Sequence, residues 1–527
     1  MPKNPKKRRQ QSRTMDGSST NQLNNKEANP KSTSDGPHIA VSSSISPSNE
    51  DNADFAASIE DKPFYEVDGE NLTPQDLMDL GHGKFKLKLS SLAKTRVAEA
   101  REVVDEIVRT NKVVYGINTG FGMFATTVVD KLKLKELQVS LVRSHAAGVG
   151  RRLSLCNTRM LFALRINVLA KGHSGISLDT LERMIKIYNA SCLPWVPEQG
   201  TVGASGDLAP LSHLALGLIG EGQMWSPKTG WTSARVVLTH NHLEPIQLKP
   251  KEGLCLINGN QLITSIGAEA CVRAELLARQ ADVIAALTLD VCKGTTAAMD
   301  PDVGRVRPHA GQIKVADRIR SLLNNRKYHS ELAESHRYCN KVQDAYSIRC
   351  CPQVHGVVWD TIEFVHKILK TEMNSATDNP NKVLCHPASV DNLPTSAGQE
   401  DHVSMGGFAA RKCLQVVANV EHVLAIELLV ATQALDFLRP LKSTAPLEAV
   451  YRLVRNVSPV LEEDRFMAPE IMAVTKLVKE GRVWEAVQPY IDEYDRDIGK
   501  QYESSSGEHS SPVTSSKKPR KEKKIRN

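Results

Sequence analysis

Apolar residues recur along the middle of the chain at the spacing of helix faces. In residues 90–110, one side of a helix collects Leu92, Val97, Ala100, Val103, Val104 and Ile107. Residues 158–171 form a second apolar helical stretch that stops at Gly172, and residues 262–289 are almost continuously apolar. Residues 355–373 and 405–438 predict two further long helices. Strand-like runs are short, "VVYGI" at 113–117 and "RVVLTH" at 235–240.

This pattern predicts a mainly α protein with a long central helix bundle and a smaller mixed N-terminal region. We expect a polar, basic, disordered tail over residues 1–60, because its Ser, Asn, Pro and Lys cannot bury enough apolar surface to order it. An N-terminal region over 61–260 and a helical bundle region over 261–500 follow. A second disordered basic tail is expected over 501–527.

Composition narrows the class of protein. Hydrophobic residues make up 41% of the chain and aromatic residues 5%, which suits a large aliphatic core. No run of eighteen apolar residues occurs, so we predict no membrane span, and the N-terminus lacks the apolar segment of a secretory signal. Ten scattered cysteines without a Cys-x-x-Cys pair favour a reducing compartment, and we predict a cytoplasmic protein.

The net charge of +7 belongs to the two ends of the chain. Residues 1–40 carry +5 and residues 501–527 carry +4, which leaves −2 on the 460 residues between them. The near-neutral middle argues against a nucleic-acid partner. The basic runs at 5–9 and 517–524 are read as solvated tails, with nuclear import or polyanion binding as the alternative.

The stretch "GTVGASGDLAPLSH" at residues 200–213 places Ser205 before an apolar helical run. A helix cap is one interpretation. A serine hydrolase is another, but its Gly-x-Ser-x-Gly order is absent. Ring closure fits better: attack of the Gly206 nitrogen on the Ala204 carbonyl gives a five-membered ring, and glycine permits that close approach. Loss of water from Ser205 then leaves an exocyclic methylene, an electrophile that no side chain supplies.

Other polar motifs lie before or between the predicted helices. "YGINTGFG" at 115–122 lacks the Gly-x-Gly-x-x-Gly dinucleotide pattern, and it is either a plain turn or a lid that presents the Tyr115 phenol. "VQDAYSIRCC" at 342–351 spaces Gln343, Tyr346 and Arg349 on one face if helical, either a solvated face or a fork for a carboxylate. Glu400 in "GQEDHVSMGG" and Asn258 in "LINGNQ" precede helices, as caps or as substrate contacts. The cysteines and histidine at 350–355 are too few to predict a metal site.

Seven motifs together resemble the aromatic amino acid ammonia-lyases, in the order found in that family. They are "YGINTGFG", "RSHAAGVG", "GASGDLAPLSHLALG", "LINGNQ", "VQDAYSIRCCPQVHG", "TEMNSATDNP" and "EDHVSMG". The resemblance runs from about residue 113 to 490 and is strongest for the histidine-specific members. It implies an ammonia-lyase/fumarase-like fold and autocatalytic formation of 4-methylidene-imidazol-5-one from Ala204-Ser205-Gly206, with no external cofactor. It further implies elimination of ammonia from L-histidine to give trans-urocanate, in a homotetramer whose sites draw on three subunits.

The resemblance also implies roles for single residues. Tyr115 matches the family's catalytic base, and Ser144-His145 matches the pair that favours histidine as substrate. The remaining matches are substrate or cofactor contacts: Asn258 and Gln343 as positioning groups, Tyr346 as an active-site tyrosine, Arg349 as the carboxylate binder, and Glu400 as the contact to the imidazole.

The chain departs from the family pattern after Pro380. A long segment that carries a Gly-Asn-Phe-His-Gly motif and part of the bundle is absent, so that residues 379–380 run directly into "NKVLCHPASVD". The alternatives to a histidine lyase are a phenylalanine or tyrosine ammonia-lyase, an aminomutase, or a catalytically impaired paralogue with an interaction role.

Overall fold

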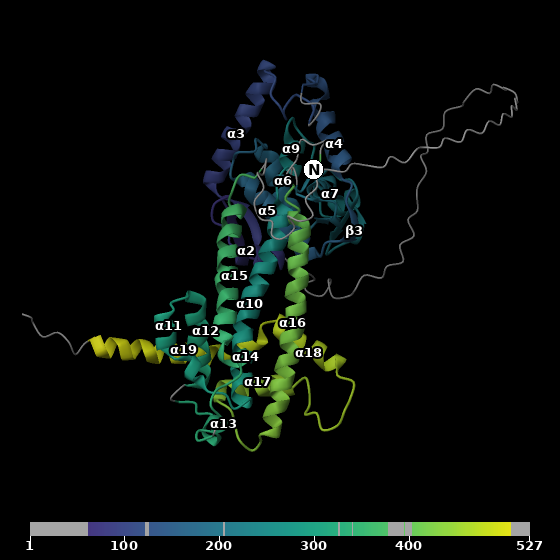
Figure 1. The fold of residues 1–527 in the computed structure, drawn as a ribbon. Coiled ribbons are helices and arrows are strands. Elements are labelled where there is room, and N and C mark those ends of the chain that lie inside the picture. Colours follow the sequence, from purple (N-terminus) through teal and green to yellow (C-terminus); the bar gives the residue numbers. More distant parts are fainter. Residues whose placement is uncertain are drawn as a thin grey trace, which may run out of the picture. The chain divides into compact units, whose positions relative to one another are not determined.

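The computed structural model describes residues 62–121, 126–203, 206–324, 327–339, 341–377, 395 and 403–506. Ala204, Ser205 and Glu400, with the predicted N-terminal tail and residues 507–527, lie outside the described residues. The last helix reaches Ser506, inside the stretch predicted as a tail. Figure 1 shows the predominance of helices, as the apolar periodicity predicts.

Short strands and helices alternate as far as residue 257. In chain order they are β1 (Phe64–Val67), α2 (Pro74–Gly81), β2 (Lys86–Leu89), α3 (Ser91–Thr110), η2 (Lys131–Lys133), α4 (Leu134–His145), β3 (Val149–Arg152), α5 (Leu155–Ala170), α6 (Leu178–Asn189), β4 (Leu193–Pro194), β5 (Pro197–Gln199), α7 (Leu208–Leu218), β6 (Gln223–Ser226), β7 (Gly230–Ser233), α8 (Ala234–His240) and α9 (Glu252–Ile257). The strands pair as parallel β1-β2, antiparallel β3-β5 and antiparallel β4-β6-β7.

Helices make up the elements that follow. They are α10 (Gln261–Val291), η3 (Thr296–Met299), α11 (Pro301–Val306), α12 (Ala310–Leu323), α13 (Glu331–Ser335), α14 (Tyr346–Arg349), α15 (Cys351–Met373), α16 (Gly406–Phe437), α17 (Ala445–Arg455), α18 (Ala468–Lys479) and α19 (Arg482–Ser506). The long helices predicted over 262–289, 355–373 and 405–438 are thus confirmed as α10, α15 and α16. In Figure 1 they run side by side, and α10 packs against both of the others.

Local sequence signals set the helix ends in the N-terminal region. The Ser90 hydroxyl accepts the Ala93 N–H and caps α3, which ends at Asn111 in the left-handed conformation. Helix α5 stops before Gly172, whose φ of +80° places the chain in a turn that a side chain would obstruct.

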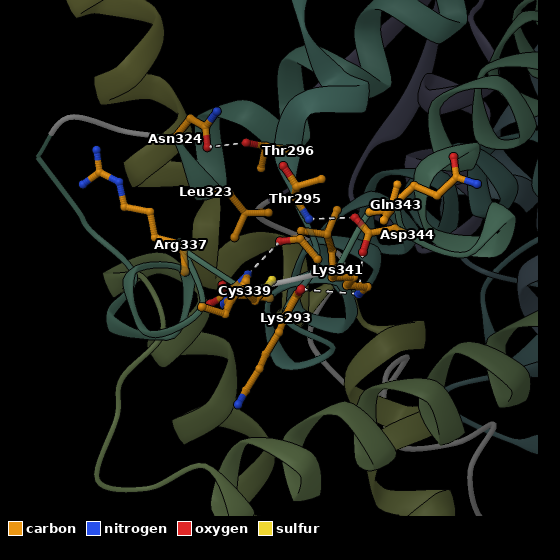
Figure 2. A pocket seen from close by; sticks show the side chains of 16 residues that line it. Lys293, Thr295, Thr296, Leu323, Asn324, Arg337, Cys339, Lys341, Gln343 and Asp344 are labelled. Carbon is orange, nitrogen blue, oxygen red and sulfur yellow. Dashed lines mark hydrogen bonds and ion pairs between the residues drawn. The ribbon is translucent and has the colours of Figure 1, made fainter.

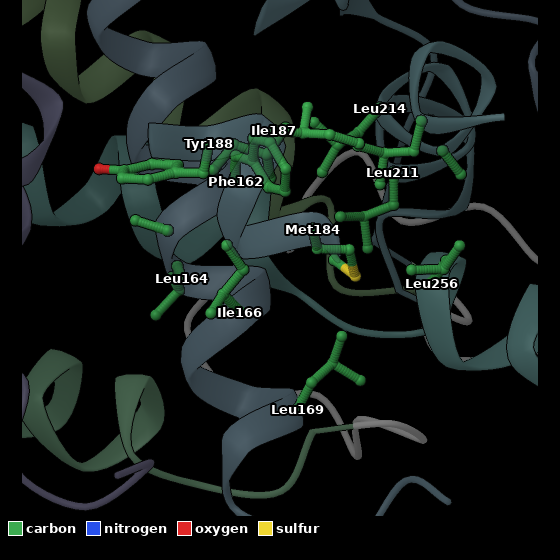
Figure 3. Packing of buried hydrophobic residues seen from close by; sticks show 14 of the residues in the cluster. Phe162, Leu164, Ile166, Leu169, Met184, Ile187, Tyr188, Leu211, Leu214 and Leu256 are labelled. Atoms are coloured by element: carbon green, nitrogen blue, oxygen red, sulfur yellow. The ribbon is translucent and has the colours of Figure 1, made fainter. Parts of the chain in front are cut away.

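Helix α5 is the centre of the first of two hydrophobic clusters. Nearly every residue on it is buried, so it shows no solvent-facing stripe. Figure 3 shows Phe162 of α5 beside Ile187 and Tyr188 of α6, and the Tyr188 ring is edge-on to Phe162 at a centroid separation of 5.6 Å. The second cluster begins at Leu277 of α10 and gathers α12 and the helices from α15 onward, so α10 joins the two.

Buried ion pairs and small residues fix the long helices against their neighbours. The Arg273 guanidinium of α10 donates to both oxygens of Glu421 on α16, at 2.9 and 3.0 Å. Gly311 of α12 lies directly on Gly356 of α15, because a Cβ at residue 311 would come within 2.0 Å of the Gly356 carbonyl oxygen.

Helix α16 is long and apolar enough to cross a membrane by length and composition, although the sequence predicts no membrane span. A third of that apolar window is buried, and Glu421 ties it to α10, as in a bundle helix.

A buried carboxylate links α10 to α12 and α15. Asp282 is fully buried, and it accepts hydrogen bonds from His355 Nδ1 at 2.8 Å and Trp359 Nε1 at 3.1 Å, besides an ion pair with Arg318. Removing the carboxylate would leave two partly buried cationic groups without their partner. We therefore expect Asp282→Ala to lower the free energy of unfolding by about 3–5 kcal/mol in urea denaturation. Asp302→Ala breaks an exposed pair with Arg305, and this control should cost less than about 1 kcal/mol. Equal losses for the two variants would contradict the expectation.

The same network gives the stability a pH dependence. Burial opposes charging of His355, but hydrogen bonds to Asp282 and Cys351 outweigh it and raise the pKa of His355 from 6.5 to about 10. The charged pair therefore stabilises the fold fully below pH 6.5 and is lost as the pH rises toward 10. We expect the difference in unfolding free energy between the wild-type protein and His355→Gln to be smaller at pH 9.5 than at pH 6.5. A difference that stays constant between these pH values would show that the pair does not titrate in this way.

Two predicted strands are wrong. Residues 113–117 form a turn, in which Asn118 Oδ1 accepts the Val114 N–H at 2.9 Å and its amide donates to the Lys112 carbonyl. A single bridge between Thr119 and Val128 is the only strand-like pairing in the described part of that loop. Residues 235–240 belong to helix α8, which buries Val237 and Leu238 on one side. In both places local contacts override the β-propensity of the valines.

Candidate active site

The loop that leads into α7 carries three glycines with positive φ, at +140° for Gly200, +76° for Gly203 and +110° for Gly206. A Cβ at residue 206 would lie 2.6 Å from the Gly259 carbonyl oxygen, so only glycine fits there. The Thr201 hydroxyl donates to the Gly206 carbonyl at 3.2 Å and accepts the Gly203 N–H at 3.1 Å. The residues on both sides of Ala204 and Ser205 are therefore held in a tight, hydrogen-bonded turn.

Asp207 joins this loop to the start of α10. Its side chain makes no capping hydrogen bond at the start of α7. Its Oδ2 accepts the N–H of Ile263, in the first turn of α10, at 2.9 Å, and its own N–H donates to Gly259 at 2.6 Å. Burial raises the pKa of Asp207 to about 7, although hydrogen bonds from Ile263 and Thr201 oppose that rise. The triplet is thus followed at once by a buried carboxyl group that caps another helix.

The segment that follows Glu400 lies against the same loop. The Ser404 hydroxyl donates to the Gly203 carbonyl at 3.1 Å, and a Cβ at residue 203 would collide with that hydroxyl. A guanidinium nitrogen of Arg411 on α16 donates to the Glu198 carbonyl at 2.9 Å. Glu400 itself lies outside the described residues, only four positions from Ser404.

Asn258 lies in the short turn between α9 and α10. It ends α9 in an extended conformation, and its carbonyl accepts a hydrogen bond from Arg165 of α5 at 2.8 Å. Because Gly259 contacts both Gly206 and Asp207, the turn lies directly beside the triplet. The structure therefore brings Asn258 close to Gly206, as expected for two residues of one site.

His145 ends helix α4, which packs against both α7 and α9. Its Nδ1 lies 2.9 Å from the Leu141 carbonyl and 3.0 Å from the Ser144 hydroxyl. Because a carbonyl only accepts, the tautomer that carries its proton on Nδ1 satisfies this contact and leaves Nε2 as an acceptor. The chain then passes Gly148, whose N–H donates to His213 Nε2 on α7 at 3.0 Å. Burial lowers the pKa of His213, which keeps that ring a neutral acceptor.

Tyr115 is exposed on the turn that Asn118 holds in place. Its ring lies edge-on to Phe121, with the centroids 6.4 Å apart. The next residue, Gly116, approaches Leu254 of α9, since a Cβ there would be 2.9 Å from the leucine Cδ2. The triplet loop, Asn258 and His145 therefore lie around α7 and α9, and the Tyr115 loop approaches α9.

The other predicted substrate contacts do not lie beside α7 and α9; they are Gln343, Tyr346 and Arg349. Tyr346 and Arg349 belong to α14, with the guanidinium 4.3 Å from the ring centroid of Tyr346. Gln343 is not on that helix, because the chain is extended at Ala345 and α14 begins only at Tyr346. The prediction that Gln343, Tyr346 and Arg349 share one helix face is therefore wrong. Arg349 Nε is buried and has no hydrogen-bond partner among the residues that the structure describes. Such an unmatched donor suits a carboxylate supplied from outside.

Gln343 lines a cavity of about 380 Å³ at the C-terminal end of α10 (Figure 2). Asp344 Oδ2 there accepts the Thr295 N–H at 2.8 Å, and Lys293 extends away from the cavity. Asn258 precedes the first residue of α10, whereas this cavity contacts the last turns of the helix. Since α10 has 31 residues at 1.5 Å each, the two groups are separated by about 45 Å. One chain therefore does not bring Gln343, Tyr346 and Arg349 to the triplet.

Metal ligands do not gather in the described ranges, where no three His, Cys, Asp or Glu side chains form a candidate ligand set. Near Cys350 and Cys351, His355 turns its Nδ1 to Asp282. The geometry thus gives that histidine a structural role in the bundle.

Known proteins with similar sequences show the family of this chain. The family model described as "Aromatic amino acid lyase" matches residues 72–382 and 381–456. Human histidine ammonia-lyase is 53% identical over 515 aligned positions, which cover 82% of this chain and 78% of the human protein. The chain belongs to the aromatic amino acid lyase family. Membership confirms the predicted resemblance and the enzyme class, a carbon–nitrogen lyase.

Solved structures of aromatic lyases and aminomutases confirm the mainly α fold. Histidine ammonia-lyase from Trypanosoma cruzi superposes with a TM-score of 0.73 at 43% identity, over 81% of this chain and 95% of that one. Tyrosine aminomutase from Streptomyces globisporus gives a TM-score of 0.74 at 30% identity, over 81% of this chain and 99% of that one. The fold alone therefore does not separate lyases from aminomutases within this family.

The alignment with the family also locates the missing segment. The two matched pieces of the family model meet at residues 381–382, where the sequence predicts the gap. The human alignment has 515 positions, whereas 82% of 527 residues is about 432, so roughly 83 positions have no counterpart in this chain. The described chain leaves α15 and enters α16 at the end of α10 that holds the triplet loop, since Thr377 bonds to Gln261 and Ser404 to Gly203. The described residues on the two sides of the gap, Thr377 and Ser404, thus both lie at this end of α10.

Several residues beside the triplet were not predicted. Asp207, Ser404 and Arg165 reach it through contacts between residues 56 to 201 positions apart in sequence, so no local pattern reveals them. Arg165 alone left a signal, a charge inside the apolar run "LFALRINVLA".

Proposed function

We propose that this aromatic amino acid lyase is a histidine ammonia-lyase that converts L-histidine to trans-urocanate and ammonia. The observation that carries the proposal is the placement of the triplet loop, Asn258 and His145 around α7 and α9, in a chain 53% identical to the human protein of that name. The Ser144-His145 pair at the end of α4 supports histidine over phenylalanine or tyrosine.

The residues around the triplet fit formation of 4-methylidene-imidazol-5-one from Ala204, Ser205 and Gly206. Gly206 has no room for a side chain, and Gly203 and Gly206 adopt positive φ, which allows the tight backbone path that ring closure requires. Thr201, Asp207 and Ser404 would hold the loop around the group. The group supplies an electrophile that no ordinary side chain offers, placed before the N-terminus of α7.

The chain's own residues bind the substrate and move its proton. Tyr115, on its pinned and exposed turn, takes the β-proton of histidine. His145 keeps Nε2 free to accept a hydrogen bond, because Nδ1 is occupied by the Leu141 carbonyl. Glu400 accepts a hydrogen bond from the substrate imidazole, which a phenyl ring does not offer. These groups therefore select for histidine as well as orient it.

A homotetramer would complete the site, because Gln343 of the predicted carboxylate-binding group lies about 45 Å away along α10. Arg349 of a second copy binds the substrate carboxylate, with Tyr346 and Gln343 beside it. Helices α15 and α16 expose apolar side chains that a second copy can cover, namely Val354, Val357, Val358, Phe364, Phe408, Val416, Val420, Val423, Ile426, Val430 and Phe437.

Sharing of the site between copies makes a complementation test possible. We expect Ser205→Ala and Arg349→Ala each to be inactive alone, and oligomers that contain both chains to regain activity. The two chains would be co-expressed with different tags and purified through both. Ser205→Ala with Tyr115→Phe is the matched control, since both changes affect the same end of α10 and should not complement. Mixed Ser205→Ala and Arg349→Ala oligomers as inactive as their parents would contradict the shared site.

A cytoplasmic location is part of the proposal. The nine cysteines in the described part of the chain are all free, which suits a reducing compartment. Fractionation of cells that express the full chain should recover it with cytosolic markers, and recovery in nuclei would instead assign a role to the basic tails.

Substrate comparison tests the function. The full chain should release ammonia from L-histidine with formation of urocanate, and react far more slowly with L-tyrosine and L-phenylalanine. Formation of β-tyrosine would favour an aminomutase, and formation of cinnamate from phenylalanine would favour a phenylalanine lyase. The absent segment favours one further candidate, a paralogue that binds partners without catalysis. No product from any of the three amino acids would support that candidate and overturn the proposal.

A further inference from the structure

Helix α5 buries two arginines six positions apart, Arg159 and Arg165, each with no exposed surface. A buried guanidinium is costly unless acceptors surround it. Arg159 donates to the carbonyls of Leu80 and Tyr188 and to the Ser191 hydroxyl, so it serves α2 and α6. Arg165 faces a different part of the molecule.

Arg165 donates to the turn between α9 and α10 and to the helix ends on either side of it. It donates to the Asn258 carbonyl and to Gln261 Oε1, both at 2.8 Å, and also to the Cys255 carbonyl. The guanidinium packs directly on the backbone, because a Cβ at Gly259 would lie 2.6 Å from one of its nitrogens. One planar, rigid cation therefore holds both ends of this turn.

The turn between α9 and α10 also contacts the last residue of the triplet, through Gly259. The Gly259 carbonyl accepts the Asp207 N–H at 2.6 Å, and a Cβ at Gly206 would lie 2.6 Å from that oxygen and 3.1 Å from the Gly259 nitrogen. The backbone of Gly206 is thus pressed against the peptide that Arg165 fixes. Displacement of the Gly259 peptide would release Gly206 and the Asp207 N–H together.

We propose that Arg165 is a positioning residue for ring closure: it holds the Asn258-Gly259 turn so that the Gly206 nitrogen stays in reach of the Ala204 carbonyl carbon. The inference rests on the proposed function. In the step, a C–N bond forms between Gly206 and Ala204, and the Ala204 oxygen leaves as water with the two amide protons of Ser205 and Gly206. The Ser205 hydroxyl and its α-proton leave as the second water, so no co-reactant is needed.

Arg165→Met and Arg159→Met make a matched pair, since each removes a fully buried guanidinium from the same helix. The readout is the mass of the peptide that spans residues 200–210, in protein purified as a folded oligomer. We expect Arg165→Met to lower the fraction of chains that have lost two waters by at least about tenfold. Arg159→Met should lose thermal stability but close the ring as the wild-type protein does. Full closure in Arg165→Met, or equal loss in both variants, would overturn the proposal.

Arg165→Lys decides the matter if Arg165→Met does not fold. Lysine keeps the buried charge but lacks the planar fork that reaches three acceptors. Lowered closure in a folded Arg165→Lys protein supports the positioning role, and full closure refutes it. The wild-type protein separates this inference from the proposed function. If the wild-type peptide keeps the encoded mass, the proposed function fails. If the wild-type protein closes the ring and the Arg165 variants close it equally well, only this inference fails.

Discussion

Replacement of Ser205 by alanine should abolish the release of ammonia from L-histidine, with a loss of several orders of magnitude in kcat/KM. In the proposed chemistry the serine supplies the carbon of the electrophile, and without it the remaining side chains would offer only binding and proton transfer. Turnover would be followed by the ultraviolet absorbance of urocanate, against the wild-type chain.

Ser212→Ala is the matched control for this loss. Ser212 lies seven residues further along, fully buried in α7, and its hydroxyl has no hydrogen-bond partner among the described residues. Its removal should leave turnover nearly unchanged. Activity in Ser205→Ala within a few-fold of Ser212→Ala would mean that Ser205 is not consumed, and that the loop has another role.

Tyr115→Phe should lower kcat by about 10²–10⁴-fold, the usual contribution of a general base, while ring closure proceeds normally. The phenol is exposed on a turn that Asn118 and Gly116 fix, so loss of the hydroxyl removes the base without disturbing the fold. The measurements are the steady-state rate with L-histidine and the mass of the 200–210 peptide in the same preparation.

Tyr65→Phe gives the comparison for Tyr115→Phe. The Tyr65 hydroxyl donates to Asp76 at 3.3 Å in the N-terminal region, and its removal should leave kcat unaltered. A Tyr115→Phe enzyme with wild-type kcat would remove the phenol from the proposed chemistry, and one with an unclosed ring would make it structural.

Helical periodicity was the most informative part of the sequence. The long apolar runs of α10 and α16 predict helices because no short strand accommodates 31 or 32 residues. The same approach failed at residues 113–117 and 235–240, where β-branched residues are common. In the first case hydrogen bonds of the Asn118 side chain fold the chain into a turn, and in the second, two buried residues on one side favour a helix.

The sequence predicts which residues take part in the chemistry of the site, but not how these residues are arranged in space. Motif order predicts the triplet, but not that Asp207 caps α10, because that contact joins residues 56 positions apart. Nor does the sequence show that Gln343 and Asn258 lie at opposite ends of one helix. That separation follows only from the course of α10, and it is the basis for proposing that a second copy completes the site.

The mass of the wild-type peptide over residues 200–210 tests the central claim most directly, because it asks whether this shortened chain closes the ring. The account predicts a peptide lighter than its encoded mass by two molecules of water, in purified full-length protein that also forms urocanate. A peptide at its full encoded mass, from protein that is folded and oligomeric, would contradict the account.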